Sequence, residues 1–252
     1  MIAYRKKFIR IVECWNGEEP NSQGADLTRR FQQTHRRVEM LNREFYTVLI
    51  DLKRDHETLF ANMKRGTRYE IKRAVNQDRL LYDLWDSSDT RAFNEFSQYC
   101  DEFLEQKRQP KLDHRWLSLL AGAKLLVLSR VSDGNGGSLV WHAYHCSPQR
   151  ATLLYSASLF RGNQNPEYRN KVGRSNRYLH WEDMLRFKSA GISTYDFGGW
   201  YDGTTDHDRL RINKFKEQFG GEIVKNYICE QALTLKGALF LRIRSSLLGN
   251  AI

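Results

Sequence analysis

With 252 residues, the chain is long enough for one large domain or two small ones. Apolar residues make up 40% of it and prolines number only 4, which excludes a disordered protein. The net charge of +10 favours an anionic partner, such as a nucleotide, coenzyme A, tRNA, an acidic glycan or an anionic membrane, without choosing among them.

The spacing of the cysteines and the length of the apolar runs indicate in which cellular compartment the protein is expected. Cys14, Cys100, Cys146 and Cys229 lie far apart and form no CxxC pair, which predicts free thiols in a reducing environment. The basic residues 1–12 lack the apolar core of a signal peptide. No apolar run reaches the roughly 18 residues that a membrane-spanning helix needs. We therefore expect a cytoplasmic protein.

The first half of the chain predicts a mixture of strands and helices. Residues 2–13 alternate as a strand does, and Asp26 is expected to cap a basic helix over residues 26–43. Residues 45–52, FYTVLIDL, have the composition of a buried strand, and a helix is expected over 55–75. The other elements expected here are a strand over 79–85 and helices over 88–106 and 113–121.

The second half contains the clearest hairpin signal. Strands are expected over 124–131 and 138–146, joined by the turn Ser-Asp-Gly-Asn-Gly-Gly at 132–137. Further on, the strand ending in YDFGGW at 195–200 carries paired glycines, which allow a sharp turn or close approach to a ligand. The remaining elements expected are strands over 151–159, 193–197 and 222–229, and helices over 179–190, 209–219 and 233–248.

Four segments resemble a known superfamily when they are taken in order. They are FYTVLIDLKRDHETLFANMKRGTRYEIKRA with its Arg68, Ile71 and Ala74 spacing, ATLLYSASL, NRYLHWEDMLRFKSAGISTYDFGG, and FKEQFGGE. Together they span residues 45–227 and resemble GNAT acyltransferases, in particular the Fem-type aminoacyltransferases that build peptidoglycan bridges. The chain departs from the Fem pattern because it is too short for two complete domains and shows no long helical hairpin.

The resemblance implies an α/β (α+β) fold with a GNAT-like, mostly antiparallel mixed sheet flanked by helices. It implies a reduced N-terminal part at residues 1–80 and an acyltransferase domain at 81–252. The activity implied is transfer of an acyl or aminoacyl group from acyl-CoA or aminoacyl-tRNA to an amine, with no permanently bound cofactor. The acceptor implied is a nucleotide- or lipid-linked glycan or peptide precursor of the cell envelope, with peripheral membrane contact left open.

GNAT enzymes hold the donor pyrophosphate on a glycine-containing loop before a helix, and residues 170–175 are a degenerate match to that loop. Backbone amides at a helix N-terminus bind phosphate, and basic side chains would add charge. An ordinary basic loop remains the alternative. The residues expected to bind the donor are Arg169, Lys171, Gly173, Arg174, Ser175, Asn176 and Phe215.

Acyl transfer to an amine needs a proton acceptor and a donor for the oxyanion. Lys216, between two phenylalanines, is the candidate for the oxyanion, with a solvated lysine as the alternative. Asp196 is the candidate base, or else it caps the following glycine turn. Tyr195 is the candidate for protonating the leaving group, and Glu182 and His180 are secondary bases.

Lys64, Arg68 and Lys72 recur every four residues on the helix expected there, so they would share one face and grip acceptor phosphates. The alternative is a solvated helix face. Trp200 completes the expected acceptor site.

Two further expectations are negative or open. His142 and His145 should point to opposite faces of a strand, so no metal site is expected. The apolar helix expected at 233–248 either packs on the domain, which we favour, or lies on a membrane. The competing function is a non-catalytic module whose basic surface binds RNA or an anionic membrane.

Overall fold

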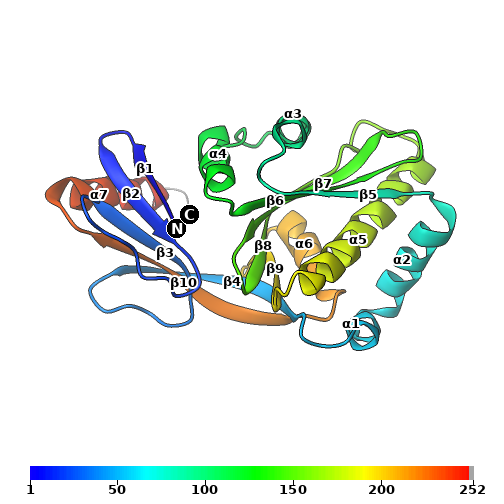
Figure 1. Ribbon diagram of the computed structural model, residues 1–252, viewed down its shortest axis with the longest axis horizontal. Helices are drawn as coiled ribbons and strands as arrows, with labels where there is room; N and C mark the ends of the chain where they lie inside the picture. Colours follow the sequence, from blue (N-terminus) through cyan, green and yellow to red (C-terminus); the bar gives the residue numbers. More distant parts are fainter. Residues whose placement is uncertain (250–252) are drawn as a thin grey trace. The chain divides into compact units, whose positions relative to one another are not determined.

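The computed structural model describes residues 1–249 as ten strands and seven helices (Figure 1). The chain forms two compact units. The first comprises Met1–Thr47 and Val224–Ile252, and the second comprises Val48–Ile223. This partition does not coincide with the division expected after residue 80, because the C-terminal segment belongs with the N-terminal one.

The first unit is a sheet with one helix. Its strands follow the order β1-β2-β3-β10-β4, with β1 and β2 antiparallel, β2 and β3 parallel, and β3 and β10 antiparallel. Ile9, Ile11 and Leu27 form its core, against which Phe240 and Leu241 pack. The elements are β1 (Ile2–Lys6), β2 (Ile9–Cys14), β3 (Leu27–Gln33), the larger parts of β4 (Leu41–Asp51) and β10 (Glu222–Ala232), and α7 (Leu235–Gly249).

The helix expected over 26–43 is wrong, because β3 and the start of β4 occupy that segment. Arg29 shows the reason. Its guanidinium lies between the carboxylates of Glu13 on β2 and Glu230 on β10, at 2.6 and 2.7 Å. An arginine expected on a basic helix thus pairs with carboxylates on strands from distant segments, and that pairing overrides local propensity.

The C-terminal helix α7 packs on the first unit with one side, as expected. Phe240 and Leu241 contact the core, while Leu235, Leu239 and Ile243 stay 91%, 53% and 46% exposed. Leu247 and Leu248, which fall within the expected apolar helix, lie outside the residues whose side chains are described. No helix within residues 1–249 has both the length and the apolarity needed to cross a bilayer.

The second unit carries strands in the order β4-β9-β8-β7-β6-β5, antiparallel from β5 to β8 and parallel between β8 and β9. Helices α3 and α4 pack on one face and α5 on the other, with α2 against α5 (Figure 1). The fold class is confirmed. The elements are α1 (His56–Asn62), α2 (Arg65–Gln77), β5 (Leu81–Trp85), α3 (Thr90–Gln106), α4 (His114–Gly122), β6 (Leu126–Ser132), β7 (Ser138–Cys146), β8 (Arg150–Ala157), α5 (Pro166–Ser189), β9 (Thr194–Trp200) and α6 (His207–Glu217).

The predicted hairpin is confirmed as β6 and β7, and β7 pairs on its other edge with β8 as expected. The single helix expected over 55–75 is wrong, because α1 ends before the extended residue Met63 and α2 begins at Arg65. The Arg68 guanidinium donates to the carbonyl oxygens of Ala61 and Met63 at 2.6 and 2.7 Å. It thereby satisfies acceptors that the end of α1 leaves without helical partners.

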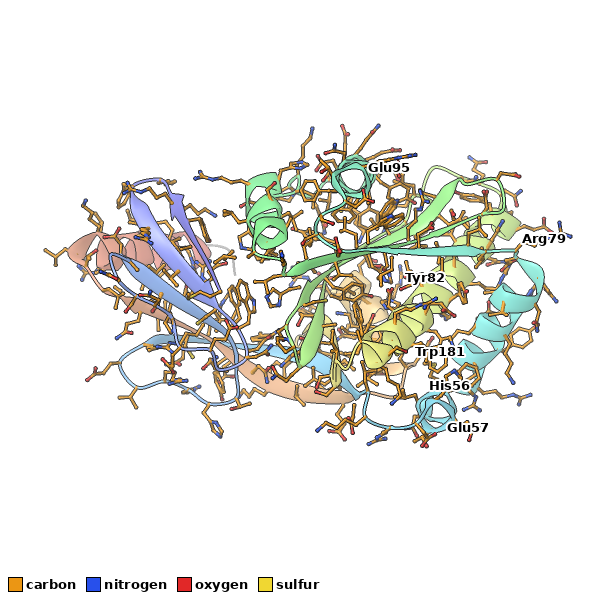
Figure 2. All side chains as sticks on the ribbon, in the orientation of Figure 1. His56, Glu57, Arg79, Tyr82, Glu95 and Trp181 are labelled. Carbon is orange, nitrogen blue, oxygen red and sulfur yellow. The ribbon has the colours of Figure 1, made fainter. Side chains whose placement is uncertain are left out.

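Helix α5 is twice as long as the expected 179–190. It begins at Pro166, with Asn165 as its cap, since the Asn165 side chain accepts from the amides of Glu167 and Tyr168. Residues 170–175 therefore lie inside a helix, and the predicted phosphate loop ahead of one is wrong. Further along α5, Trp181 packs edge-on against His56 of α1, with ring centroids 4.9 Å apart (Figure 2).

Candidate functional site

Strands β8 and β9 pair at only three positions, Arg150 with Thr194, Ala151 with Tyr195 and Thr152 with Asp196. Just beyond, β9 turns at Gly198, whose φ is +66°. A Cβ there would lie 2.6 Å from the carbonyl oxygen of Leu153, so the position requires glycine. The ladder between β8 and β9 thus covers these three positions, and β9 still approaches β8 closely at Gly198.

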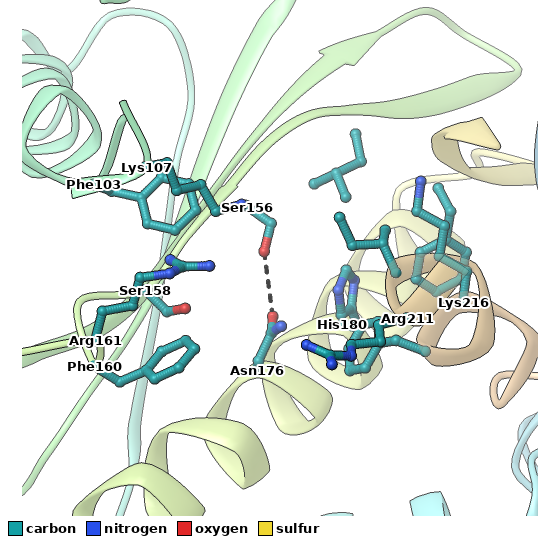
Figure 3. A pocket seen from close by; sticks show the side chains of 14 residues that line it. Phe103, Lys107, Ser156, Ser158, Phe160, Arg161, Asn176, His180, Arg211 and Lys216 are labelled. Atoms are coloured by element: carbon teal, nitrogen blue, oxygen red, sulfur yellow. Dashed lines mark hydrogen bonds between the residues drawn. The ribbon is translucent and has the colours of Figure 1, made fainter. Parts of the chain in front are cut away.

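A cavity of about 280 Å³ lies just beyond this ladder and is lined by residues of both strands (Figure 3). Ser156 of β8 and Phe197 of β9 face it, and α5 and α6 close one side. Figure 3 shows Phe103 and Arg161 on one side, across from His180 and Lys216. The lining residues are Phe103, Lys107, Leu153, Ser156, Ser158, Phe160, Arg161, Asn176, His180, Phe197, Arg211, Ile212, Phe215 and Lys216. We call this space the β8–β9 cavity.

Lys216 is the only predicted catalytic residue of the first rank that lines this cavity. It is 8% exposed, and its ammonium donates to the carbonyl oxygens of Gly198, at 3.2 Å, and of Gly199. Burial lowers the pKa of Lys216 to about 8, although the nearby Asp196 opposes that shift. An ammonium has three N–H donors, so one remains for a ligand.

Every Asp, Glu, Lys or Arg side chain that lines the cavity is basic. Besides Lys216 these are Lys107, Arg161 and Arg211. Burial, and secondly the neighbouring Arg161, lower the pKa of Lys107. A concave site with one sign of charge favours an anionic ligand. Among the described side chains, no three of the His, Cys, Asp or Glu type gather as a metal site would require.

Of the other predicted catalytic residues, Asp196, Tyr195 and Glu182 do not line the cavity. Asp196 is ion-paired with Arg150 at 2.7 Å and accepts from the amide of Gly198 at 2.9 Å, which supports the turn. The Tyr195 hydroxyl is buried and bonded to His180. Glu182, on α5, does not line the cavity, and burial raises the pKa of its carboxyl. His180 itself does line the cavity.

The residues expected to bind the donor are divided between two places. Asn176 and Phe215 line the β8–β9 cavity. Arg169, Gly173 and Arg174 instead line a separate hollow of about 350 Å³ between α2 and α5. Arg174 is engaged there by both carboxylate oxygens of Asp78, at 2.7 and 2.8 Å. Ser175 is buried, and Lys171 lines neither space.

The residues expected to bind the acceptor do not line the β8–β9 cavity. Lys64 is exposed and precedes α2, and Arg68 is bonded to carbonyl oxygens at the end of α1. The Lys72 ammonium lies 5.7 Å from the ring centre of Phe60. Trp200 lines an adjoining hollow next to α6, together with His207 and Lys214.

Sequence reasoning missed Lys107 and Arg161. Lys107 caps the C-terminal end of α3, and Arg161 lies in the loop before α5. No local motif marks either of them, since only the folded sheet brings both to one cavity. The helix spacing of Asn176, His180 and Asp183 on α5 is a signal that could have been used, because it puts the three on one face.

At the level of sequence, neither a family model nor a curated protein matches the chain. Solved structures do. FemX superposes with a TM-score of 0.61 at 11% identity, over 82% of this chain and 72% of that one. The fold is that of FemX. The C-terminal domain of a putative lysylphosphatidylglycerol synthetase from Agrobacterium fabrum gives 0.58 at 14% identity, over 90% and 74% of the two chains. L-PGS from Bacillus licheniformis gives 0.55 at 11%, over 96% and 84%.

Proposed function

We propose that this protein transfers an acyl or aminoacyl group from an anionic donor to an amine in the β8–β9 cavity. The observation that carries the proposal is the buried Lys216 at a basic cavity lined by residues of β8 and β9. In the reaction, the amine nitrogen bonds to the donor carbonyl carbon and the bond from that carbon to sulfur or oxygen breaks. The amine loses a proton and the leaving group gains one.

Lys216 would stabilise the oxyanion that develops on the donor carbonyl. Its position is fixed by the two glycine carbonyls, so little rearrangement is needed as charge develops. The aromatic rings of Phe197 and Phe215 line this part of the cavity, and apolar surroundings strengthen an electrostatic interaction. Below pH 8 the side chain carries the charge that this role requires.

The donor carries phosphates in this proposal. Lys107, Arg161 and Arg211 at the cavity would bind these phosphates. Both coenzyme A and the acceptor end of a tRNA carry such phosphates. The name of lysylphosphatidylglycerol synthetase describes a protein that makes a lysyl product, and that likeness favours an aminoacyl group. The acceptor is an amine of a cell-envelope precursor, and the reaction is expected in the cytoplasm.

The proposal is tested by incubating the protein with lysyl-tRNA, and separately with acetyl-CoA, with glycinamide as acceptor. Mass spectrometry then detects the acylated amide and the consumed donor. Lys216→Ala should lower kcat by about 100- to 1000-fold without weakening donor binding. Lys216→Arg should not fully restore it, because a planar guanidinium does not replace a compact ammonium.

The exposed Lys214→Ala, two residues away on α6, is the matched control and should be neutral. Donor binding without turnover in the wild type would contradict the proposal. Should Lys216→Ala and Lys214→Ala then weaken RNA or anionic-vesicle binding equally, the non-catalytic binding module would be the better account.

A further inference from the structure

A chain of buried hydrogen bonds leads from Asp183 to the cavity. The Tyr144 hydroxyl contacts Asp183 Oδ2 at 2.6 Å and the Tyr195 hydroxyl at 2.8 Å. The Tyr195 hydroxyl contacts His180 Nδ1 at 2.6 Å. All four side chains are at most 1% exposed, and only His180 lines the cavity. We call these residues the Asp183–His180 chain.

Asp183 is the fixed end of the chain. The Tyr144 hydroxyl and His142 Nδ1 are hydrogen-bonded to its Oδ2, at 2.6 and 2.8 Å. The Tyr82 hydroxyl is hydrogen-bonded to its Oδ1, at 3.0 Å. The hydroxyls of Tyr144 and Tyr82 both donate to this carboxylate. A carboxylate oxygen accepts, so the proton in each of these bonds comes from the partner.

That requirement sets the direction of every later bond. Each tyrosine hydroxyl has one proton, and Tyr144 uses its proton on Asp183. The bond between the two hydroxyls therefore uses the proton of Tyr195. The contact of Tyr195 with His180 then needs a proton on Nδ1 of the imidazole. A neutral imidazole carries one proton, so Nε2 of His180 keeps its lone pair.

The surroundings keep His180 neutral. The rings of Phe197 and Phe219 pack against it, with centroids 4.9 and 5.2 Å away. Burial, and then the charges of His142, Lys216 and Arg177, hold the pKa of His180 well below its usual range. His142 belongs to β7, Lys216 to α6 and Arg177 to α5. Tyr195 faces the ring from β9.

We propose that His180 Nε2 is the proton acceptor for the attacking amine, and that Tyr195, Tyr144 and Asp183 position it by fixing its tautomer. This rests on the proposed acyl transfer. As the carbon–nitrogen bond forms, the amine proton passes to Nε2. His180 then gives that proton to the leaving sulfur or oxygen as its bond to carbon breaks, so the imidazole ends neutral. Lys216 acts on the oxyanion and His180 on the proton.

The tautomer is tested without any substrate. In protein labelled with ¹⁵N at its 7 histidines, two-bond proton–nitrogen spectra report which ring nitrogen carries hydrogen. The His180→Gln spectrum assigns the signal. We expect the neutral Nδ1–H form at pH 7, and a rise of the other tautomer in Tyr195→Phe and Tyr144→Phe. Tyr99→Phe removes a half-buried hydroxyl that donates to the carbonyl oxygen of Leu139, and it should leave the signal unchanged.

The proton-transfer role is tested with the lysyl-tRNA and acetyl-CoA assays. His180→Gln should lower kcat by about 100-fold or more while donor binding, followed by thermal shift, is retained. Tyr195→Phe should lower kcat by about tenfold or more and alter the acid limb of the pH profile. The exposed His35→Gln, which lies in the first unit, is the control.

The two proposals fail in different ways. The inference is overturned, whatever the activity, if His180 of the wild type is an imidazolium at pH 7 or if its neutral form carries the proton on Nε2. Near-normal turnover of His180→Gln overturns it while leaving acyl transfer intact. A wild type that carries the expected tautomer but turns over neither donor refutes the proposed function, and the base role falls with it.

Discussion

Lys216 should make the protein less stable than it would be with an apolar side chain in its place. Its pKa falls from the ordinary 10.5 to about 8 in the folded chain, which corresponds to about 3 kcal/mol of unfavourable burial of the charge. Lys216→Met keeps much of the side-chain length and removes the charge, but loses the bonds to the two glycine carbonyls. We expect a net gain of about 1–3 kcal/mol at pH 7.

The sign of the pH dependence follows from the same values. Below pH 8 the amine is protonated in both the folded and the unfolded protein, so the full destabilisation is present. Between pH 8 and 10.5 the unfolded chain binds more protons, and wild-type stability should rise with pH relative to Lys216→Met. Above 10.5 the destabilisation from the charge should be gone.

The assay is urea unfolding of full-length wild type and Lys216→Met at pH 7 and at pH 9.5, followed by circular dichroism. The exposed Lys214→Met on the same helix is the control and should differ little from wild type at both pH values. A Lys216→Met protein that is less stable than wild type at pH 7, by an amount independent of pH, would refute the buried-charge argument. Acyl transfer should be lost in this variant, as happens where activity needs a destabilised group.

Four other outcomes are expected. Transfer should slow above about pH 8 as Lys216 deprotonates, and Lys216→Arg should lack that limb in a pH–rate profile. Gly198→Ala places a Cβ at φ +66° and against a carbonyl oxygen. It should lower the free energy of unfolding, measured in urea, by about 1–3 kcal/mol and should also reduce activity. Arg68→Ala should lower the free energy of unfolding by about 1–3 kcal/mol because two carbonyls lose their donor. A raised acceptor KM with unchanged stability would instead support phosphate binding by the face that Arg68 shares with Lys64 and Lys72. Leu241→Ala should destabilise by about 1–3 kcal/mol, against little change for the exposed Leu239→Ala.

The sequence determined those elements whose signals are local. The turn at 132–137 supplies its own glycines, so the β6–β7 hairpin follows from adjacent residues. The apolar run at 45–52 predicted the buried end of β4 because its side chains suit a sheet covered on both faces. The order of four motifs was enough to predict the fold shared with FemX. The segment FKEQFGGE put Lys216 between two phenylalanines, and the structure has this lysine at the β8–β9 cavity.

Only the tertiary structure decided what each charge does. Arg29 looks like a helix residue until Glu230, 201 residues away, is brought beside it. Arg68 reads as a phosphate ligand, but it bonds to the end of α1. The helix spacing puts Asp183 and His180 on one face of α5. The two hydroxyls that connect them belong to β7 and β9, so only the folded sheet completes the link. Side-chain pairing over such separations depends on strand order and register, which local patterns in a sequence do not encode.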